Sequence, residues 1–271
     1  MKPQILAQAA EAIIYKKGNK VVKDRISKSY RIKELDNKIR KSRTKSEIKL
    51  LEKAGKIINT PLPIKKEVID NMGGNSNILG GDNKIIMPFI NGKKLSEHLD
   101  EFPLAKQKPI LNQIGQDVAK LHDADIIHSD LTTSNMILVE NNSSTLQKNK
   151  LVINKKFNKV DEQLNKVGLV DNKLGWASDF AREIKINDNE RCRELGEVKV
   201  YFIDFGLGYI SKKIEDKAVD IHLLKQALEA KHFKNWEVLF KSFLKGYSKS
   251  KDYKEVIERL KKVEARGRYK H

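Results

Sequence analysis

Two short polar motifs carry the residue types that phosphoryl transfer needs. His128-Ser-Asp130 is followed by Asn135, and Asp204-Phe-Gly206 lies farther along the chain. Phosphoryl transfer needs one carboxylate that accepts or orients the nucleophile's proton, which we assign to Asp130. It also needs a carboxylate and an amide that hold a metal ion against the phosphates, which we assign to Asp204 and Asn135. Asp130 and Asn135 are five residues apart, the spacing of the catalytic carboxylate and the metal-binding amide in a known signature for this chemistry.

The alternative is that these residues only form turns, since Ser, Asn, Asp and Gly favour turns wherever they occur. Residues 136–139 and 199–203 are apolar, strand-like runs, so each motif adjoins the end of a predicted strand. Ordinary turns would predict neither the order nor the spacing of the two motifs. Together the motifs favour a phosphotransfer site that uses ATP and Mg²⁺.

The segments around the motifs predict both strands and helices. Strand-like runs at 12–15 and 20–25 flank the turn Lys-Lys-Gly-Asn, and a Gly/Asn-rich loop covers 70–83. A helix is predicted over 33–56, with Gly55 near its end and an apolar face of Ile39, Ile48, Leu51 and Ala54. Another strand is predicted at 84–90, a helix at 104–124 and a mostly helical region at 216–265. This order predicts an α+β protein with a sheet-rich N-lobe over 1–90 and a helical C-lobe over 91–271.

Several stretches follow a more specific pattern: Ala10-Glu-Ala12, 22–31, Leu35-Asp36, Arg43-Thr44 with Glu47, 127–136, 202–208, 215–220 and Arg266-Gly-Arg268. In these stretches the chain resembles the small atypical serine/threonine kinase family of the KEOPS (EKC) complex, the Bud-thirty-two or PRPK-like kinases of archaeal type. That complex supports threonylcarbamoylation of the adenosine beside the tRNA anticodon. The resemblance covers about residues 5–140 and 198–268. Its most specific features are Thr-Thr-Ser within the catalytic loop and an activation segment of only about ten residues.

The resemblance implies a two-lobed protein-kinase-like fold and a set of nucleotide-binding residues. Lys23 matches the lysine that neutralises the α- and β-phosphates, and Glu47 is its expected ion-pair partner, with Glu52 as a weaker candidate. Asp220 is expected to anchor the catalytic loop through hydrogen bonds. His128 is expected to pack behind that loop rather than act as a base.

The nucleotide-covering stretch and the adenine hinge depart from the family pattern. No G-x-G-x-x-G is present; residues 8–12 take its place, with Gln8 and with Ala9 where the family usually has Gly. Ser129 replaces the glycine of the family's His-Gly-Asp. The expected hinge is Met87-Pro88-Phe89-Ile90, in which Pro88 has no N–H. The Pro88 carbonyl and the Ile90 N–H are the groups we expect to meet adenine.

Residues 141–197 have no counterpart in the family pattern and are predicted to be an insertion between two strands. The simplest interpretation is a solvated insertion rich in Asn and Lys. A small docking element built on Leu174, Trp176 and Phe180 is the alternative. Cys192 lies within this segment and receives no role.

The charge balance indicates a polyanionic partner. Lys and Arg number 54 and Asp and Glu 36, for a formal net charge of +18. Clusters lie at 23–45 and 259–270, and the resemblance implies that Arg266, Arg268 and Lys270 reach phosphates of tRNA or the nucleotide site. A generally Lys-rich surface is the alternative. No apolar run approaches a membrane span, and one cysteine without an export signal favours the cytoplasm.

Three functions compete on these residues. The first is an ATPase or serine/threonine kinase in a tRNA-modifying assembly, whose partners would be the threonylcarbamoyl-transferase subunit, other KEOPS subunits and tRNA. The second is a scaffold that binds tRNA and partner subunits with little catalysis, which the changes at Ala9 and Ser129 leave open. The third is a small-molecule phosphotransferase, which the Thr-Thr-Ser loop and the Arg-Gly-Arg tail disfavour. The complete set of Lys23, Asp130, Asn135 and Asp204 favours the first.

Overall fold

The computed structural model describes residues 3–8, 11–64, 83–140 and 198–267. One compact unit comprises residues 1–139 and 200–271, and residues 140–199 form a second unit. The predicted loop at 70–83, except for Asn83, and the predicted insertion at 141–197, with Leu174, Trp176, Phe180 and Cys192, lie outside the described residues.

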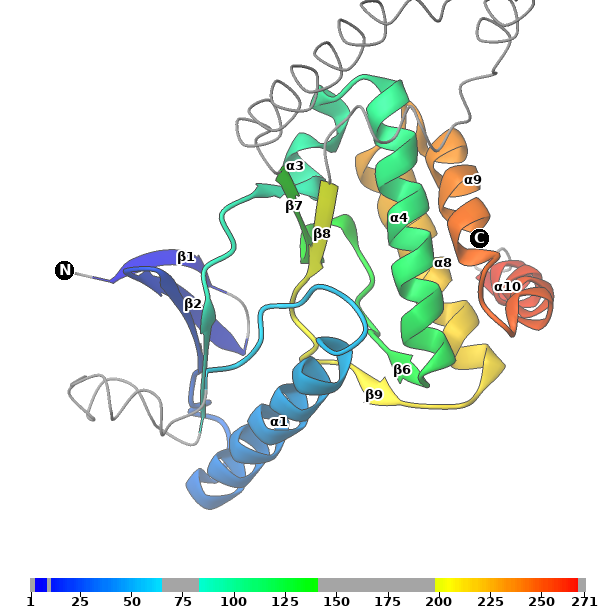
Figure 1. The fold of residues 1–271 in the computed structure, drawn as a ribbon. Coiled ribbons are helices and arrows are strands. Elements are labelled where there is room, and N and C mark those ends of the chain that lie inside the picture. The colour runs from blue at the N-terminus through cyan, green and yellow to red at the C-terminus, as the bar shows by residue number, and fades with distance from the viewer. Residues whose placement is uncertain (1–2, 9–10, 65–82, 141–197, 268–271) are drawn as a thin grey trace, which may run out of the picture. The chain divides into compact units, whose positions relative to one another are not determined.

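The first lobe of the larger unit is a four-stranded antiparallel sheet with one helix (Figure 1). Its elements are β1 (Gln4–Gln8), β2 (Ala12–Lys17), β3 (Lys20–Arg25), α1 (Lys33–Ala54) and β4 (Lys84–Pro88), in the sheet order β1-β2-β3-β4. The turn between β2 and β3 contains Gly18 at φ 59°, a conformation that glycine adopts without steric cost. Strand β1 was not predicted, because its five residues are all exposed and show no apolar alternation.

The buried face of α1 is more polar than its sequence pattern predicts. Leu51 and Ala54 are buried as expected, but Ile39 and Ile48 are only half-buried. Asp36, Thr44 and Glu47 occupy buried positions instead. Each of these polar side chains has a partner: Glu47 pairs with the buried cations Lys23 and Arg25 of β3, Asp36 pairs with Arg40 and accepts from Ser27, and Thr44 donates to the Arg40 carbonyl oxygen.

The second lobe is mainly helical. Its elements are β5 (Lys93–Lys94), α3 (Leu95–His98), the 3₁₀ helix η1 (Leu99–Glu101), α4 (Leu104–Asp123), β6 (Ile126–Ile127), the 3₁₀ helix η2 (Thr133–Asn135), β7 (Met136–Glu140), β8 (Val198–Phe202), β9 (Tyr209–Ile210), α8 (Ile214–Lys231), α9 (Trp236–Tyr247) and α10 (Tyr253–Gly267). Strands β5, β7 and β8 form a small sheet in that order, and β6 pairs with β9. These elements together match the α+β arrangement predicted from the sequence.

Helix α4 is the centre of this lobe and packs against α9 (Figure 1). A Cβ at Gly115 would collide with the carbonyl oxygen of Phe243, and one at Gly246 with that of Asn112, so the two backbones lie in close contact. Helix α8 packs against α10 and α9 and also contacts β6 and η2. These helices thereby form a base for the loop between β6 and β7. Within the described ranges, no helix is long and apolar enough to cross a membrane.

Candidate active site

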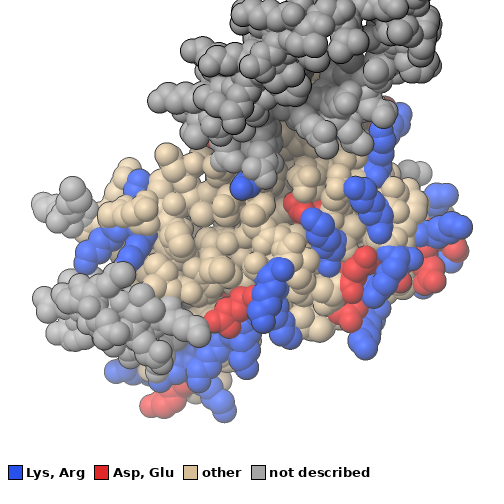
Figure 2. All heavy atoms as spheres, viewed as in Figure 1, with Lys and Arg blue, Asp and Glu red and all other residues tan. Residues whose placement is uncertain are grey.

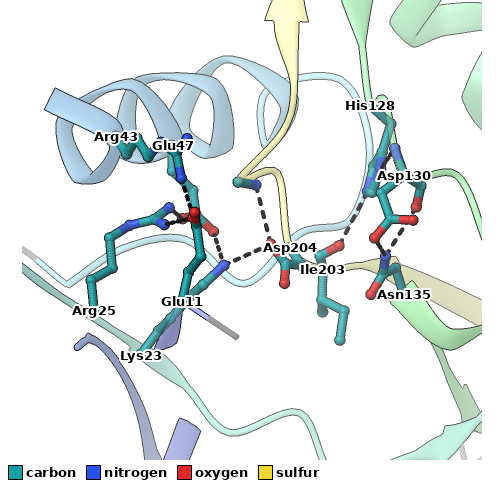
Figure 3. Close-up of polar contacts among 11 residues, drawn as sticks. Glu11, Lys23, Arg25, Arg43, Glu47, His128, Asp130, Asn135, Ile203 and Asp204 are labelled. Carbon is teal, nitrogen blue, oxygen red and sulfur yellow. Dashed lines mark hydrogen bonds and ion pairs between the residues drawn. The ribbon is translucent and has the colours of Figure 1, made fainter. Parts of the chain in front are cut away.

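Lys23 links the first lobe to the Asp-Phe-Gly turn. Its Nζ donates to Glu47 Oε1 at 2.8 Å and to Asp204 Oδ1 at 2.6 Å (Figure 3). Lys23 is 6% exposed and Glu47 is 1% exposed, so this ion pair lies in an environment that screens charge weakly. The expected pairing of Lys23 with Glu47 is confirmed, whereas Glu52 lies on the exposed side of α1.

Arg25 shares Glu47 with Lys23, and sequence reasoning did not identify this role. Arg25 Nη2 donates to Glu47 Oε2 at 2.6 Å, and Arg25 Nη1 lies 3.7 Å from Glu11 Oε2. Glu11 directly precedes β2, within the nucleotide-covering stretch, and it also pairs with Arg43 of α1 (Figure 3). The Arg43 hydrogen bond lowers the pKa of Glu11 below its usual value. These ion pairs tie the stretch that replaces a glycine-rich loop to helix α1.

The catalytic loop holds Asp130 through Asn135. Asn135 Nδ2 donates to the Asp130 carbonyl oxygen at 2.9 Å and to Asp130 Oδ2 at 2.8 Å (Figure 3). Because Nδ2 is engaged with Asp130, the amide oxygen Oδ1 is the atom of this side chain that can bind a cation. The Asn135 carbonyl accepts the N–H of Ile203 at 2.9 Å. That bond places the metal-ligand candidate Asn135 beside the residue that precedes Asp204.

His128 packs behind the loop, as expected. It is 1% exposed, and its ring centroid lies 4.6 Å from that of Phe205. Its Nε2 lies 3.1 Å from the Ile203 carbonyl, and the Asp130 N–H donates to its Nδ1 at 3.3 Å. Both ring nitrogens are therefore engaged in holding backbone, which leaves none directed at a substrate.

Asp220 of α8 anchors the start of the catalytic loop, which confirms its predicted role. Its carboxylate accepts the N–H of His128 at 2.8 Å and that of Ser129 at 2.9 Å. Ser129 has a φ of 64°, in the left-handed region that glycine enters most readily. The serine therefore occupies a conformation suited to the glycine of the family pattern.

Asp204 combines a strained backbone with a stabilised charge. Its φ is 62°, and such strain in a non-glycine residue often marks a functional site. Burial acts to raise the pKa of Asp204, but the ammonium of Lys23 and the N–H of Gly206 outweigh it, so the pKa lies below its usual value. A Cβ on Gly206 would approach Asp204 Oδ1 to 2.9 Å and Lys23 Nζ to 3.2 Å, so a side chain there would have to displace the ends of this ion pair.

The donors at this site suit Mg²⁺. Asp204 supplies an ionised carboxylate and Asn135 an amide oxygen, and Mg²⁺ prefers oxygen ligands. Within the described ranges, no group of three or more His, Cys, Asp or Glu side chains could hold a metal ion. Two protein ligands fit a Mg²⁺ that takes its other ligands from water and substrate phosphates.

Of the expected nucleotide-covering and hinge residues, Gln8 lies on β1, Met87 and Pro88 lie on β4, and Phe89 and Ile90 follow β4. Gln8 ends β1 opposite Ile13, and Ala9 lies outside the described residues. Pro88 ends β4 and is exposed, while Met87 and Ile90 are half-buried. The Phe89 N–H donates to the Asn19 carbonyl at 3.0 Å, so this hinge N–H is used within the sheet.

The tail is described only as far as Gly267. Arg266 lies in the last turn of α10, and its Nη1 donates to Glu215 Oε1 of α8 at 2.5 Å. Its side chain is 66% exposed, so it can also meet a partner in solvent. Arg268 and Lys270 lie outside the described residues.

Comparisons with known proteins identify the family. The chain is 32% identical over 254 residues to the KEOPS complex subunit Bud32 of Pyrococcus abyssi, a match that covers 92% of this chain and 84% of that protein. It is 31% identical over 251 residues to a probable serine/threonine-protein kinase BUD32 homolog of Archaeoglobus fulgidus, covering 93% of this chain and 89% of that one. No protein-family model matches the chain.

A longer relative and a solved structure also align with the chain. A probable bifunctional tRNA threonylcarbamoyladenosine biosynthesis protein of Methanobrevibacter smithii is 34% identical over 277 residues, covering 98% of this chain but 37% of that protein. The Rio2 kinase of Chaetomium thermophilum, solved as an ADP/Mg²⁺-phosphoaspartate complex, aligns with a TM-score of 0.46 at 12% identity, covering 96% of this chain and 70% of that one. The fold class rests on the relatives in sequence and on the observed elements, which agree on a two-lobed, protein-kinase-like α+β fold. The chain belongs to the Bud32 kinase family.

Proposed function

We propose that this chain is an ATP-dependent atypical serine/threonine kinase or ATPase of the KEOPS complex that supports formation of threonylcarbamoyladenosine at tRNA position 37. One observation carries the chemical part of the proposal: Lys23 joins Glu47 to Asp204, and Asn135 holds Asp130 at the adjoining loop. The names of its relatives, a KEOPS subunit and tRNA threonylcarbamoyladenosine biosynthesis proteins, support the biological part.

Each side chain has a defined part in this proposal. Lys23, oriented by Glu47, neutralises charge on the ATP phosphates. Asp204 and Asn135 Oδ1 hold Mg²⁺, which supplies further neutralisation of phosphate charge when bound. Asp130, fixed by Asn135 Nδ2, accepts or orients the proton of the attacking hydroxyl or water. Gln8 and Ala9 cover the nucleotide, and Met87, Pro88 and Ile90 form the wall against adenine.

The proposed contact with tRNA rests on the outward face of α1 as well as on the tail. This face exposes six cations against the exposed acids Glu34 and Glu52: Lys33, Lys38, Lys41, Lys45, Lys49 and Lys53. Figure 2 shows Lys and Arg side chains gathered over this helix, with others interspersed with Asp and Glu over the helical lobe. We include Arg266, Arg268 and Lys270 in the proposed contact, because neutralised phosphates release counterions and drive binding.

We propose the threonylcarbamoyl-transferase subunit as the protein partner, alongside other KEOPS subunits. A groove of about 430 Å³ lies between the end of α1 and β9, lined in part by Lys49, Lys53 and Lys56 and by Tyr209 and Ile210. Tyr209 and Ile210 expose apolar surface at this groove, and Leu207, two residues before Tyr209, is also exposed. Apolar anchors within a charged rim are typical of a protein interface. The assignment to the cytoplasm follows from the proposed tRNA substrate.

Phosphate release tests this function. The purified chain is assayed with ATP and Mg²⁺, alone and with the transferase subunit, tRNA or both. We expect Mg²⁺-dependent release that tRNA and the subunit alter together. Binding of tRNA and the subunit without any turnover would overturn the enzymatic proposal in favour of a scaffold. The variant Ile210→Ser should weaken binding of the subunit, whereas Phe233→Ser, another exposed apolar residue, should not.

A further inference from the structure

Helix α8 meets the catalytic loop at two places, and sequence reasoning identified only the first. Asp220 accepts the N–H groups of His128 and Ser129 at the start of the loop. His232, which follows the last residue of α8, places its Nε2 3.1 Å from Thr133 Oγ1. Asp220 and His232 lie about three helical turns apart, and Asp130 lies between the two points of attachment in the loop.

The contact between His232 and Thr133 is buried. His232 and Thr133 are each 1% exposed. His232 Nδ1 lies 3.0 Å from Asp100 Oδ1 of η1, within ion-pair distance but out of line for a hydrogen bond. The Asp100 carboxylate favours the tautomer with its proton on Nδ1, and in that tautomer Nε2 accepts the Thr133 hydroxyl proton. Removing the imidazole would leave the Thr133 hydroxyl buried without this partner.

Thr133 opens the short turn that carries the metal-ligand candidate. It is the first residue of η2, which ends at Asn135. Asn135 in turn holds Asp130 by two hydrogen bonds and accepts the N–H of Ile203, the neighbour of Asp204. A shift of η2 would therefore move Asn135 relative to both carboxylates.

We propose that His232, oriented by Asp100, is a positioning residue for phosphoryl transfer. It fixes Thr133 and hence the orientation of η2, so that Asn135 Oδ1 and the Asp130 carboxylate keep the geometry that transfer requires. The proposal rests on the proposed function, but the part of it that concerns loop structure does not. Misplacing reacting groups by about 1 Å can lower a rate about 100-fold.

The role predicts a particular kinetic pattern. His232 acts on Asn135 and Asp130 but contacts neither Lys23 nor the expected hinge. Substituting it should therefore lower kcat and raise the Mg²⁺ concentration for half-maximal turnover, while the KM for ATP changes less than about twofold. A general loss of folded protein would lower kcat without changing the Mg²⁺ midpoint.

The test uses the full chain with four variants. His232→Ala removes the imidazole, Thr133→Val removes only the hydroxyl, and the third variant combines the two. His98→Gln is the matched control, because His98 Nδ1 lies 3.0 Å from Glu101 Oε2 in a similar but more exposed pair, which has no hydrogen bond to the described catalytic loop. Thermal unfolding first establishes that each variant is folded. If His232→Ala is unfolded, Thr133→Val alone tests the contact.

We expect His232→Ala and Thr133→Val each to lower kcat about tenfold or more. The double variant should have a kcat similar to that of the single variants, because each substitution removes the same interaction. His98→Gln should match the wild type. Hydrogen exchange without nucleotide should show the amide of Asn135, which is bonded to the Thr132 carbonyl, exchanging about tenfold faster in His232→Ala.

Two results would overturn the proposal. One is a folded His232→Ala whose kcat and amide exchange match those of the wild type. The other is a double variant in which the kcat losses of the two single variants multiply, as they would at independent sites. If the wild type itself shows no turnover, the proposed function fails, and the exchange measurement still decides whether His232 holds the loop.

Discussion

The side chains of Lys23 and Asp204, 181 residues apart in the chain, meet in a 2.6 Å hydrogen-bonded ion pair. Lys23 comes from the central part of the first-lobe sheet, and Asp204 follows β8 of the small sheet in the second lobe. Since Lys23 also pairs with Glu47 of α1, one ammonium group couples the helix, the sheet and the Asp-Phe-Gly turn.

The ionisation of Asp204 makes the stability of the fold sensitive to acid. An unfolded Asp has a pKa of about 3.9, and in the folded chain Lys23 and the Gly206 N–H outweigh burial and hold the pKa of Asp204 lower. The stabilisation is therefore complete above the unfolded pKa and is lost as pH falls through the folded one. Between pH 7 and pH 3, the free energy of unfolding measured with denaturant should fall more steeply in the wild type than in Asp204→Asn. If the free energies of the two proteins change in parallel with pH, the ion pair does not stabilise the fold.

The serine at position 129 should cost stability because of its backbone. Ser129 has a φ of 64°, which costs a non-glycine residue about 1–2 kcal/mol, while glycine gains flexibility in the unfolded chain. Ser129→Gly should retain the N–H bond to Asp220 and raise the free energy of unfolding by about 0.5–1 kcal/mol. Chemical denaturation measures this difference in the free energy of unfolding. A variant less stable than the wild type would show that the Ser129 side chain makes a compensating contact.

The predicted insertion should be dispensable for folding and nucleotide binding. Strands β7 and β8, on either side of it, are hydrogen-bonded neighbours in one sheet. Replacing residues 145–195 by a short Gly/Asn turn shortens the loop, which does not add to its closure entropy. We expect unchanged binding of a fluorescent ATP analogue and a similar melting temperature. A fall of more than about 10 °C would show that the segment contributes to the core.

The tail and α1 should contribute separately to tRNA binding. Truncation after Gly267 removes Arg268 and Lys270 but keeps Glu264, which pairs with Lys225 at 2.7 Å. We expect lower affinity for tRNA and a salt dependence reduced by about one unit of slope for each phosphate that the truncated chain no longer neutralises. Lys38→Gln with Lys45→Gln on the exposed face of α1 should lower the slope further.

Heparin distinguishes a specific contact from general basicity. If the surface is merely Lys-rich, heparin should bind as tightly as tRNA, and the truncation should weaken both in proportion to the charge removed. That pattern would remove the support for tRNA as the partner.

The local chemistry of the site was predictable because it lies in short motifs at strand ends. Asp130 with Asn135 and Asp204 with Gly206 stand close in sequence, and their spacing carries the geometry. The pairing of Lys23 with Glu47 followed from the family resemblance. The structure joins Lys23 to both Glu47 and Asp204, and the hydrogen bond from the Ile203 N–H to the Asn135 carbonyl joins the catalytic loop to the Asp-Phe-Gly turn.

Other parts of the site depend on contacts that leave no pattern in sequence. Arg25 and Arg43 meet Glu11 across the first lobe, in a chain where lysine and arginine are abundant. His232 and Thr133 are 99 residues apart, and a lone histidine after a helix gives no periodic signal. The polar buried face of α1 was missed for a similar reason, because hydrophobic periodicity does not register buried positions filled by hydrogen-bonded or ion-paired side chains.

The most direct test of the central claim is Mg²⁺-dependent ATP turnover by wild type and Asp204→Asn, measured as phosphate release over a Mg²⁺ series. Loss of one ligand charge should remove several kcal/mol of transition-state stabilisation, a fall of about 100-fold or more, with a far-UV spectrum and melting transition typical of a folded chain. Asp24→Asn, which removes a half-buried carboxylate paired with Lys84 on the same sheet, should retain wild-type turnover. A folded Asp204→Asn that releases phosphate within about twofold of the wild type would contradict the assignment of this site.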